Sequence, residues 1–222
     1  MNYDKLFSFK TIHESIKMFQ KLLPKNCFFV KTPMYLCDCT IKCPCNNKFF
    51  SDFFKWRTKE KVVFLVYSIT ENFAHCIAGV IDMKSYTIDL YDQTGETDIY
   101  KSLDCNKLFP HEYNMIYQYV IHTLKERFSL NKFKIQAHTR NELRPLYCVQ
   151  NSNGMCAFWS LIYIILRSND VDAYKAPEII YDISNQAVIK KENQIKAFVF
   201  LIEILEKQNK KDYSKNIMNV LK

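Results

Sequence analysis

Glycine is scarce in this chain: three of the 222 residues are glycine, at positions 79, 95 and 154. No Gly/Ser-rich linker and no internal repeat interrupts the sequence, so nothing in it marks a boundary between two domains. Single cores commonly extend to about 250 residues. We therefore expect one domain over residues 1–222, with its core at about 60–170, an N-terminal helix and Cys-rich loop at 1–59, and a C-terminal helical part at 171–222.

Long apolar runs and a secretory signal are also missing. The longest uncharged apolar run, from Ala157 to Leu166, is about ten residues long, whereas a membrane span needs roughly 20. We therefore predict a buried helix there and no membrane partner. The N-terminus has no apolar segment followed by a small-residue cleavage site. We expect an intracellular, reducing location, and the odd number of nine cysteines agrees with thiols rather than a closed disulfide framework.

The composition is that of a globular protein, with 48% hydrophobic, 15% aromatic and 24% charged residues. The net charge of +8 could attract nucleic acid or an acidic surface. The lysines, however, are spread along the chain and concentrate only modestly after Lys190. A solvated surface is the favoured interpretation, and nucleic-acid binding is a weaker alternative.

The residue pattern predicts an alternation of helices and strands. Three consecutive β-rich segments predict strands, KVVFLVYSI at 61–69, AHCIAGVID at 74–82 and YTIDLYD at 86–92. The short link between the last two is typical of an antiparallel hairpin. Helical spacing predicts helices at 11–23, 110–128, about 156–167 and 185–207, and a further strand is expected at 133–138. We interpret residues 31–52 as loops with short strands.

Cys156 has the position expected of a nucleophile. It follows the polar turn NSNG and begins the apolar helix, and a helix N-terminus lowers the pKa of a thiol. The backbone N–H of Cys156 could also stabilise an oxyanion, and the side-chain amide of Gln150, six residues earlier, could act as a second donor.

His75 is the best-placed histidine to act as the base for this thiol. It lies at the beginning of one predicted strand, and Asp92, seventeen residues later, ends the next strand, so a hairpin could bring the two together. Two other acids are less suitable. Asp89 is three residues from Asp92 and so faces the other side of a regular strand, while Asp82 lies at the turn end of the hairpin.

The order His75, Asp92, Gln150, Cys156, in the local contexts HCIAGVID, YDQTG and VQNSNGMC, resembles the SUMO-specific (ubiquitin-like-protein) cysteine proteases and the related adenovirus-type maturation proteases. Papain-like enzymes have the cysteine before the histidine. The resemblance covers roughly residues 62–167.

The resemblance implies an α+β fold with a central mixed sheet packed by helices and the nucleophile at the N-terminus of a buried helix. It implies His75 as general base, Asp92 as its partner, Gln150 as oxyanion donor and Cys156 as nucleophile, with no cofactor. The implied partner is a protein substrate cleaved near glycine, either the tail of a ubiquitin-like modifier or a viral precursor. A composition rich in Lys, Asn, Ile and Tyr favours a viral or parasite source, and a viral enzyme could be packaged in the virion.

Three positions depart from the usual family pattern. Cys76 stands where an aromatic residue commonly follows the histidine, Met155 where an acidic residue often precedes the nucleophile, and Ala157 where glycine is usual. Two alternative functions remain. One is a catalytically silent relative that binds a modifier or virion protein, and the other is an acetyltransferase that uses the same triad. A single buried structural cysteine is the simplest alternative for Cys156, but its occurrence together with the other three residues favours catalysis.

A second cysteine motif, CDCTIKCPC, contains Cys37, Cys39, Cys43 and Cys45. Four thiols at this density suit zinc, but structural zinc sites usually contain C-x2-C pairs separated by a longer loop. Thiols on a loop are the favoured interpretation, and a zinc site or a redox pair is the alternative.

Overall fold

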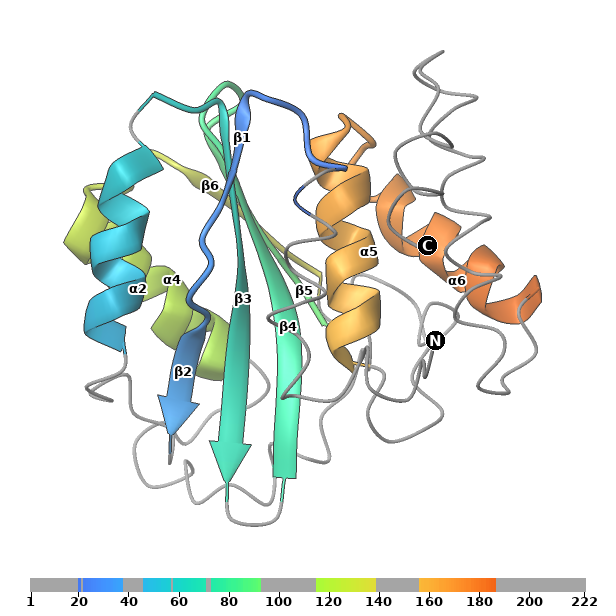
Figure 1. Ribbon diagram of the computed structural model, residues 1–222, viewed down its shortest axis with the longest axis horizontal. Coiled ribbons are helices and arrows are strands. Elements are labelled where there is room, and N and C mark those ends of the chain that lie inside the picture. The colour runs from blue at the N-terminus through green and yellow to red at the C-terminus, as the bar shows by residue number, and fades with distance from the viewer. Residues whose placement is uncertain are drawn as a thin grey trace.

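The computed structural model describes residues 20, 22–37, 46–56, 58–70, 73–92, 115–138 and 156–186, and for a few of these, including His75, it describes the backbone alone. Within this part of the chain, six strands form one mixed sheet with the order β1-β3-β4-β5-β6, and β2 also pairs with β3 (Figure 1). The strands are β1 (Cys27–Phe29), β2 (Met34–Cys37), β3 (Lys61–Thr70), β4 (Phe73–Asp82), β5 (Thr87–Tyr91) and β6 (Lys134–His138).

The sheet combines both pairing directions. The central strands β3, β4 and β5 pair antiparallel, while β1 and β2 pair parallel with successive parts of β3, and β6 pairs parallel with β5. A parallel pair needs a crossover connection, and the chain between β5 and β6 includes α4 (Met115–Phe128). The three strands and the hairpin predicted from the sequence are confirmed, as is the strand at 133–138.

Each face of the sheet has its own core, because side chains alternate between the two faces of a strand. On β4, Cys76, Ala78 and Val80 face the helix α5 (Cys156–Ser168), and Ile77 and Ile81 face the opposite side. The helices α4 and α2 (Asn46–Phe53) cover that opposite side, as Figure 1 shows. The predicted α+β class, with helices packed on a mixed sheet, is confirmed.

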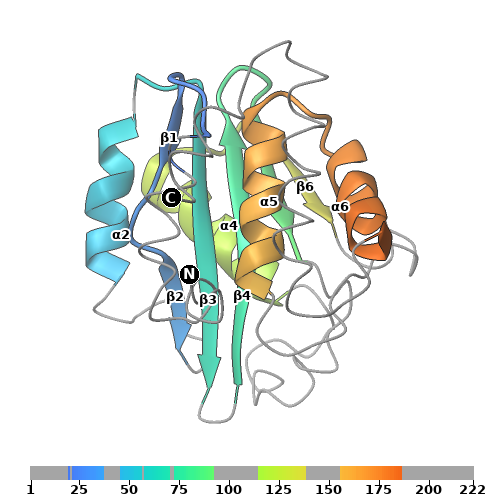
Figure 2. The ribbon, with the colours of Figure 1, turned by 45° about the vertical axis from the view of Figure 1, so that its right-hand side comes forward.

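The helix α5 is buried around its whole circumference, as the apolar run in the sequence predicts. All thirteen of its residues are buried. Figure 2 shows α5 lying against the sheet at β4, with α6 (Lys175–Gln186) on its outer side. A helix that is apolar on every side requires partners on every side, and the sheet and α6 are two of them.

Two α-helices within the described residues were not predicted, and the short 3-10 helix η2 (Phe54–Trp56) was not predicted either. The segment 31–52, interpreted as loops with short strands, contains β2 but also α2, which buries Phe49, Phe50 and Phe53 on one side. The helix α6 ends at Gln186, so it overlaps the helix predicted at 185–207 by its last two residues, and residues 187–207 of that prediction lie outside the described residues. The helix predicted at 11–23 also lies almost entirely outside them.

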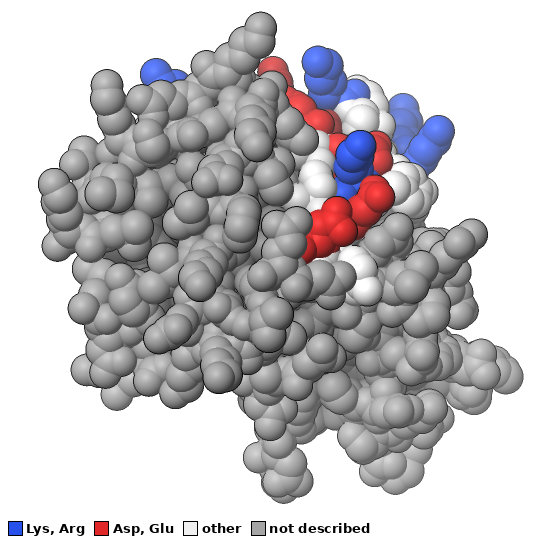
Figure 3. Space-filling view, turned by 90° about the vertical axis from the view of Figure 1, so that its right-hand side faces the viewer, with Lys and Arg blue, Asp and Glu red and all other residues white. Residues whose placement is uncertain are grey.

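The described surface contains charges of both signs. Figure 3 shows one face of the molecule, on which the described lysine or arginine side chains lie next to aspartate or glutamate side chains instead of forming a patch of one sign. None of the helices in the described ranges combines the length and the apolar character that a membrane crossing requires.

Candidate active site

Cys156 is the first residue of α5, as predicted, and its side chain is 3% exposed. At this position the backbone N–H groups of the first turn have no partner within the helix, and they carry the positive end of the helix dipole. The local environment therefore suits a negative charge, either on the Cys156 sulfur or on an oxygen bound next to it.

His75 is the third residue of β4, where it pairs with Ser68 of β3. The β4–β5 ladder ends at the pair Ala78 and Tyr91, and in the same register Asp92 would come opposite Ile77. His75 precedes Ile77 by two residues, so its backbone lies roughly 7 Å along β4 from the position opposite Asp92. The hairpin therefore brings these two segments to the same end of the sheet.

Two contacts define how α5 lies along β4. The Ser160 hydroxyl donates a hydrogen bond to the Cys76 carbonyl, with an Oγ–O distance of 3.1 Å. Seven residues later, Arg167 contacts Asp89, which pairs with Val80 of β4. The helix and the strand therefore run in the same direction. Cys156 lies one turn, about 6 Å, before Ser160, so its backbone is level with the residues just before Cys76 in β4, where His75 lies.

Cys76 and Tyr67 are two neutral groups that lie near Cys156. Burial raises the pKa of the Cys76 thiol well above its ordinary value, and the nearby Cys156 thiol and Asp92 carboxylate also raise it. Burial likewise raises the pKa of Tyr67, with smaller contributions from Cys76, Tyr35 and Cys156. Both groups remain protonated near neutral pH, so neither adds a negative charge that would oppose a thiolate at Cys156.

Asp92 follows β5 directly and is 3% exposed. A carboxylate this well buried needs charged or hydrogen-bonding partners, and Asp92 lies near enough to Cys76 to influence its pKa. The two rival acids have other contacts. Asp89 binds Arg167 at 2.6 Å, and Asp82 accepts hydrogen bonds from the backbone N–H groups of Lys84 and Ser85 in the hairpin turn.

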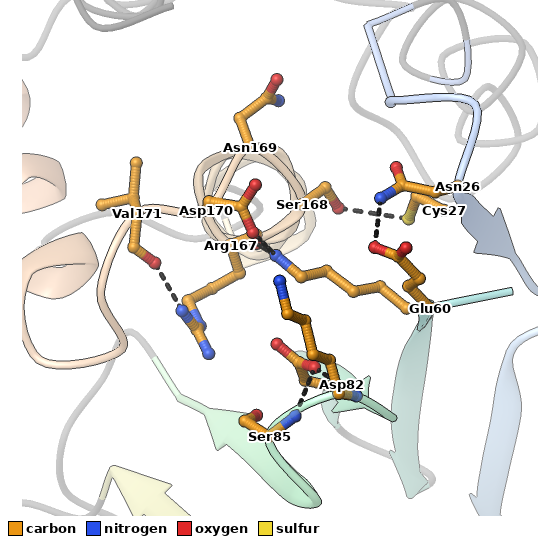
Figure 4. A network of polar contacts seen from close by, with 12 residues as sticks. Asn26, Cys27, Glu60, Asp82, Ser85, Arg167, Ser168, Asn169, Asp170 and Val171 are labelled. Atoms are coloured by element: carbon orange, nitrogen blue, oxygen red, sulfur yellow. Dashed lines mark hydrogen bonds and ion pairs between the residues drawn. The ribbon is translucent and has the colours of Figure 1, made fainter.

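The far end of α5 is held by buried cations. The Lys61 Nζ donates to the Arg167 carbonyl at 2.8 Å and contacts the Asp170 carboxylate at 2.5 Å. The Arg167 guanidinium binds Asp89 on one side and the Val171 carbonyl on the other. Figure 4 shows Arg167, Asp170 and Val171 gathered around the last turn of the helix. Positive charge at a helix C-terminus is favourable, and these contacts fix α5 at the end opposite to Cys156.

Some predicted site residues lie outside what the structure describes. Gln150 is outside the described residues, and so is the side chain of His75. Of the four-cysteine motif, Cys37 is the last residue of β2, and the other three cysteines, Cys39, Cys43 and Cys45, lie outside. Among the described residues there is no group of three or more His, Cys, Asp or Glu that could hold a metal ion.

Two further residues of this region were not identified as site residues from the sequence. Cys76 was noted only as a departure from a family pattern, and Ser160 was not singled out. A sequence signal for Ser160 did exist. A hydroxyl in the middle of a fully buried helix needs a hydrogen-bond partner, and at four residues after Cys156 it lies on the same side of the helix.

Gly79 has a structural role that does not involve the site. It pairs with Phe64 of β3, and a Cβ atom on Gly79 would come within 2.2 Å of the Phe64 ring. In the structure, the demand on Gly79 comes from the ring packed over it.

Taken together, the fold and this region define an α+β protein in which a cysteine begins a buried helix beside a histidine-bearing strand. The chain matches no protein-family model and no curated protein. Two of the solved structures that are similar to it are SUMO protease domains. One is "SUMO protease Ulp1 with the catalytic cysteine oxidized to a sulfenic acid", with 13% identity, a TM-score of 0.42, and coverage of 81% of this chain and 77% of that chain. The other is the C-terminal Ulp1 protease domain in complex with Smt3, the yeast ortholog of SUMO, with the same identity and coverage and a TM-score of 0.39.

Proposed function

We propose that this protein is a cysteine peptidase in which Cys156 is the nucleophile, His75 the general base, Asp92 the acid that orients His75, and Gln150 an oxyanion donor. The observation that carries the proposal is the register of α5 on β4. The Ser160 contact to Cys76 brings the first residue of α5 level with His75, and Asp92 lies buried at the same end of the sheet.

The reaction is an acyl transfer to sulfur. His75 takes the proton of the Cys156 thiol, and the sulfur attacks the carbonyl carbon of the scissile peptide bond. The negative oxygen of the tetrahedral intermediate accepts hydrogen bonds from the Cys156 backbone N–H and from Gln150. The C–N bond then breaks and the amine leaves with the proton from His75. A water molecule, deprotonated by His75, hydrolyses the thioester and restores the thiol.

For the substrate, we propose a protein with glycine near the cleaved bond, either the tail of a ubiquitin-like modifier or a viral precursor protein. This follows from the order and contexts of the four residues, which resemble the proteases that process such modifiers. We propose an intracellular location from the odd number of cysteines, and a viral source from the composition. The single-domain organisation over residues 1–222 also remains a proposal.

Covalent labelling tests the proposed function. Purified protein is treated with electrophilic probes that carry ubiquitin, SUMO or a Gly-Gly-X peptide, and wild type is compared with Cys156→Ser and His75→Ala by intact mass. The proposal predicts one adduct on wild type, none on Cys156→Ser and a much slower reaction for His75→Ala. The probe that reacts identifies the substrate class.

Other outcomes of this experiment favour the alternatives. Binding of a modifier without any adduct would favour a catalytically silent relative. In a parallel incubation with acetyl-CoA, transfer of the acetyl group to a protein side chain would favour an acetyltransferase that uses the same triad. Labelling spread over Cys37 to Cys45 and indifferent to His75 would contradict the peptidase proposal.

A further inference from the structure

We propose that Ser160 is a positioning residue that holds Cys156 in line with His75. The inference rests on the proposed function and adds to it a residue that does not touch the reacting atoms. Ser160 is connected to both proposed catalytic residues. Cys156 lies one helical turn before Ser160, and the hydrogen-bond partner of Ser160, Cys76, directly follows His75.

The contact is fully buried and joins the two elements that carry the proposed nucleophile and base. Ser160 is 0% exposed, and its Oγ donates to the Cys76 carbonyl oxygen at 3.1 Å. Cys76 is also fully buried, and its thiol lies close enough to Cys156 for Cys156 to raise its pKa. The hydrogen bond therefore lies in the layer between α5 and β4, within one turn of the thiol.

Apolar packing alone does not fix the position of α5 along β4 to a fraction of an ångström. The surrounding side chains are aliphatic or aromatic, and dispersion contacts change gradually as two surfaces slide. A hydrogen bond is directional and weakens steeply when its geometry is lost. A misplacement of about 1 Å far from the reacting atoms can cost on the order of 100-fold in rate, so a contact that fixes this register has a direct effect on turnover.

The chain offers a matched control on the same helix. Ser168 is 2% exposed, and its Oγ lies 3.4 Å from the Sγ of Cys27 in β1. Like Ser160, it is a buried serine that links α5 to the sheet. It differs in lying twelve residues from Cys156, at the opposite end of the helix. Its loss therefore removes a similar contact but leaves the helical turn that carries Cys156 in place.

The experiment compares wild type, Ser160→Ala, Ser168→Ala and Ser160→Thr in the full-length protein. Steady-state cleavage gives kcat and KM per folded molecule, on whichever modifier or Gly-Gly-X substrate the wild type cleaves. The rate of Cys156 alkylation by iodoacetamide is also followed against pH, and thermal unfolding reports stability.

A positioning role predicts a specific split between these measurements. Ser160→Ala lowers kcat about 10- to 100-fold with KM within about twofold, and its alkylation profile moves to higher pH because the thiolate loses its alignment with His75. Ser168→Ala lowers the melting temperature but leaves kcat and the alkylation profile as in wild type. Ser160→Thr, which retains the hydroxyl, recovers most of the lost kcat.

Four results would overturn the inference. If the wild type cleaves its substrate and folded Ser160→Ala has the same kcat and alkylation profile, the positioning role fails while the proposed function stands. If Ser160→Ala and Ser168→Ala lose kcat equally, any buried contact of α5 would have the same effect, and Ser160 would have no specific positioning role. If Ser160→Ala does not fold, a Ser160→Thr protein that folds but has lost kcat would contradict the role. A wild type that neither cleaves nor is labelled would overturn the proposed function together with the inference.

Discussion

At the scale of single residues, the packing of Gly79 against Phe64 across the β3–β4 pair leads to a testable prediction. Its missing side chain leaves room for the ring of Phe64, which is fully buried and also contacts Phe49 and Phe53. Because the ring has aromatic neighbours, it cannot move freely to admit a methyl group. We expect Gly79→Ala to lower the free energy of unfolding by about 1–3 kcal/mol, measured by urea denaturation.

The control for Gly79 is the same substitution in a Phe64→Leu background. A smaller side chain at position 64 should admit the added Cβ, so the penalty of Gly79→Ala should shrink in that background. A Gly79→Ala protein that is more stable than wild type would contradict the packing account, because it would show only the loss of chain entropy expected at an unconstrained glycine.

Cys76 predicts a dependence of stability on alkaline pH. Burial raises the pKa of its thiol well above the ordinary value of 9.0, so the native protein keeps it protonated where the unfolded chain ionises. Its contribution to stability is therefore complete below about pH 9 and is lost as the pH rises towards the folded pKa. In this window we expect the free energy of unfolding to fall more steeply for wild type than for Cys76→Ala, by about 1.4 kcal/mol per pH unit.

Urea denaturation between pH 8 and pH 10.5 measures this difference. The raised pKa values of Cys27 and Tyr163, which also follow from burial, act in both proteins and so do not affect the comparison. Equal slopes for wild type and Cys76→Ala would show that the Cys76 thiol is solvated or ionised in the native state.

Among the proposed site residues, the sequence was most informative about position in an element. It predicted Cys156 at the start of a buried helix. It set Asp89 aside by strand alternation, but the structure places Asp89 on the α5 side of the sheet, where its carboxylate is held by the ion pair with Arg167. It did not predict the contact between Ser160 and Cys76, since these residues are 84 positions apart. Such a contact depends on how two elements pack, which a one-dimensional pattern does not contain.

At the scale of elements, α5 depends on the buried pair of Arg167 and Asp89. Burial raises the pKa of Asp89 and the adjacent guanidinium opposes this, while the 2.6 and 2.7 Å contacts to one carboxylate oxygen favour the ion pair. Removing one partner leaves the other buried and unpaired. We expect Arg167→Ala to cost about 3–5 kcal/mol of the free energy of unfolding, measured by urea or thermal denaturation.

The exposed pair of Lys55 and Asp52 is the matched control for this prediction. Its N–O distance is similar, at 2.8 Å, but the Lys55 side chain is 65% exposed. Lys55→Ala should therefore change stability by less than about 1 kcal/mol. Similar costs for the two substitutions would mean that burial does not determine the strength of these pairs, contrary to the account given for the end of α5.

The predicted and missed elements differ in the strength of their sequence signals. The strands β3, β4 and β5 are rich in β-branched and aromatic residues and carry few competing signals. The helix α2 has only eight residues and follows a segment rich in Cys and Pro, which indicates a loop. The helix α6 did have a signal, because Asp172 accepts hydrogen bonds from the N–H groups of Tyr174 and Lys175 as an N-cap does.

At the scale of the whole molecule, the sheet separates a structural core from a core that carries the site. One face packs Phe49, Phe50 and Phe53 of α2 against β3, and the other packs α5 against β3 and β4. Because α5 is held at both ends, by Ser160 near Cys156 and by Lys61 and Arg167 at its C-terminus, the fold itself sets where the proposed nucleophile lies relative to β4.

The measurement that tests this account most directly is the pH dependence of Cys156 alkylation by iodoacetamide, followed by peptide mass mapping in wild type, His75→Ala and Asp92→Asn. It needs no knowledge of the substrate. The account predicts selective modification of Cys156 in wild type below pH 8, and a shift of the profile to higher pH when His75 is removed, with a smaller shift for Asp92→Asn. Modification of Cys156 that follows one profile in all three proteins would contradict the central claim that His75 and Asp92 serve this thiol.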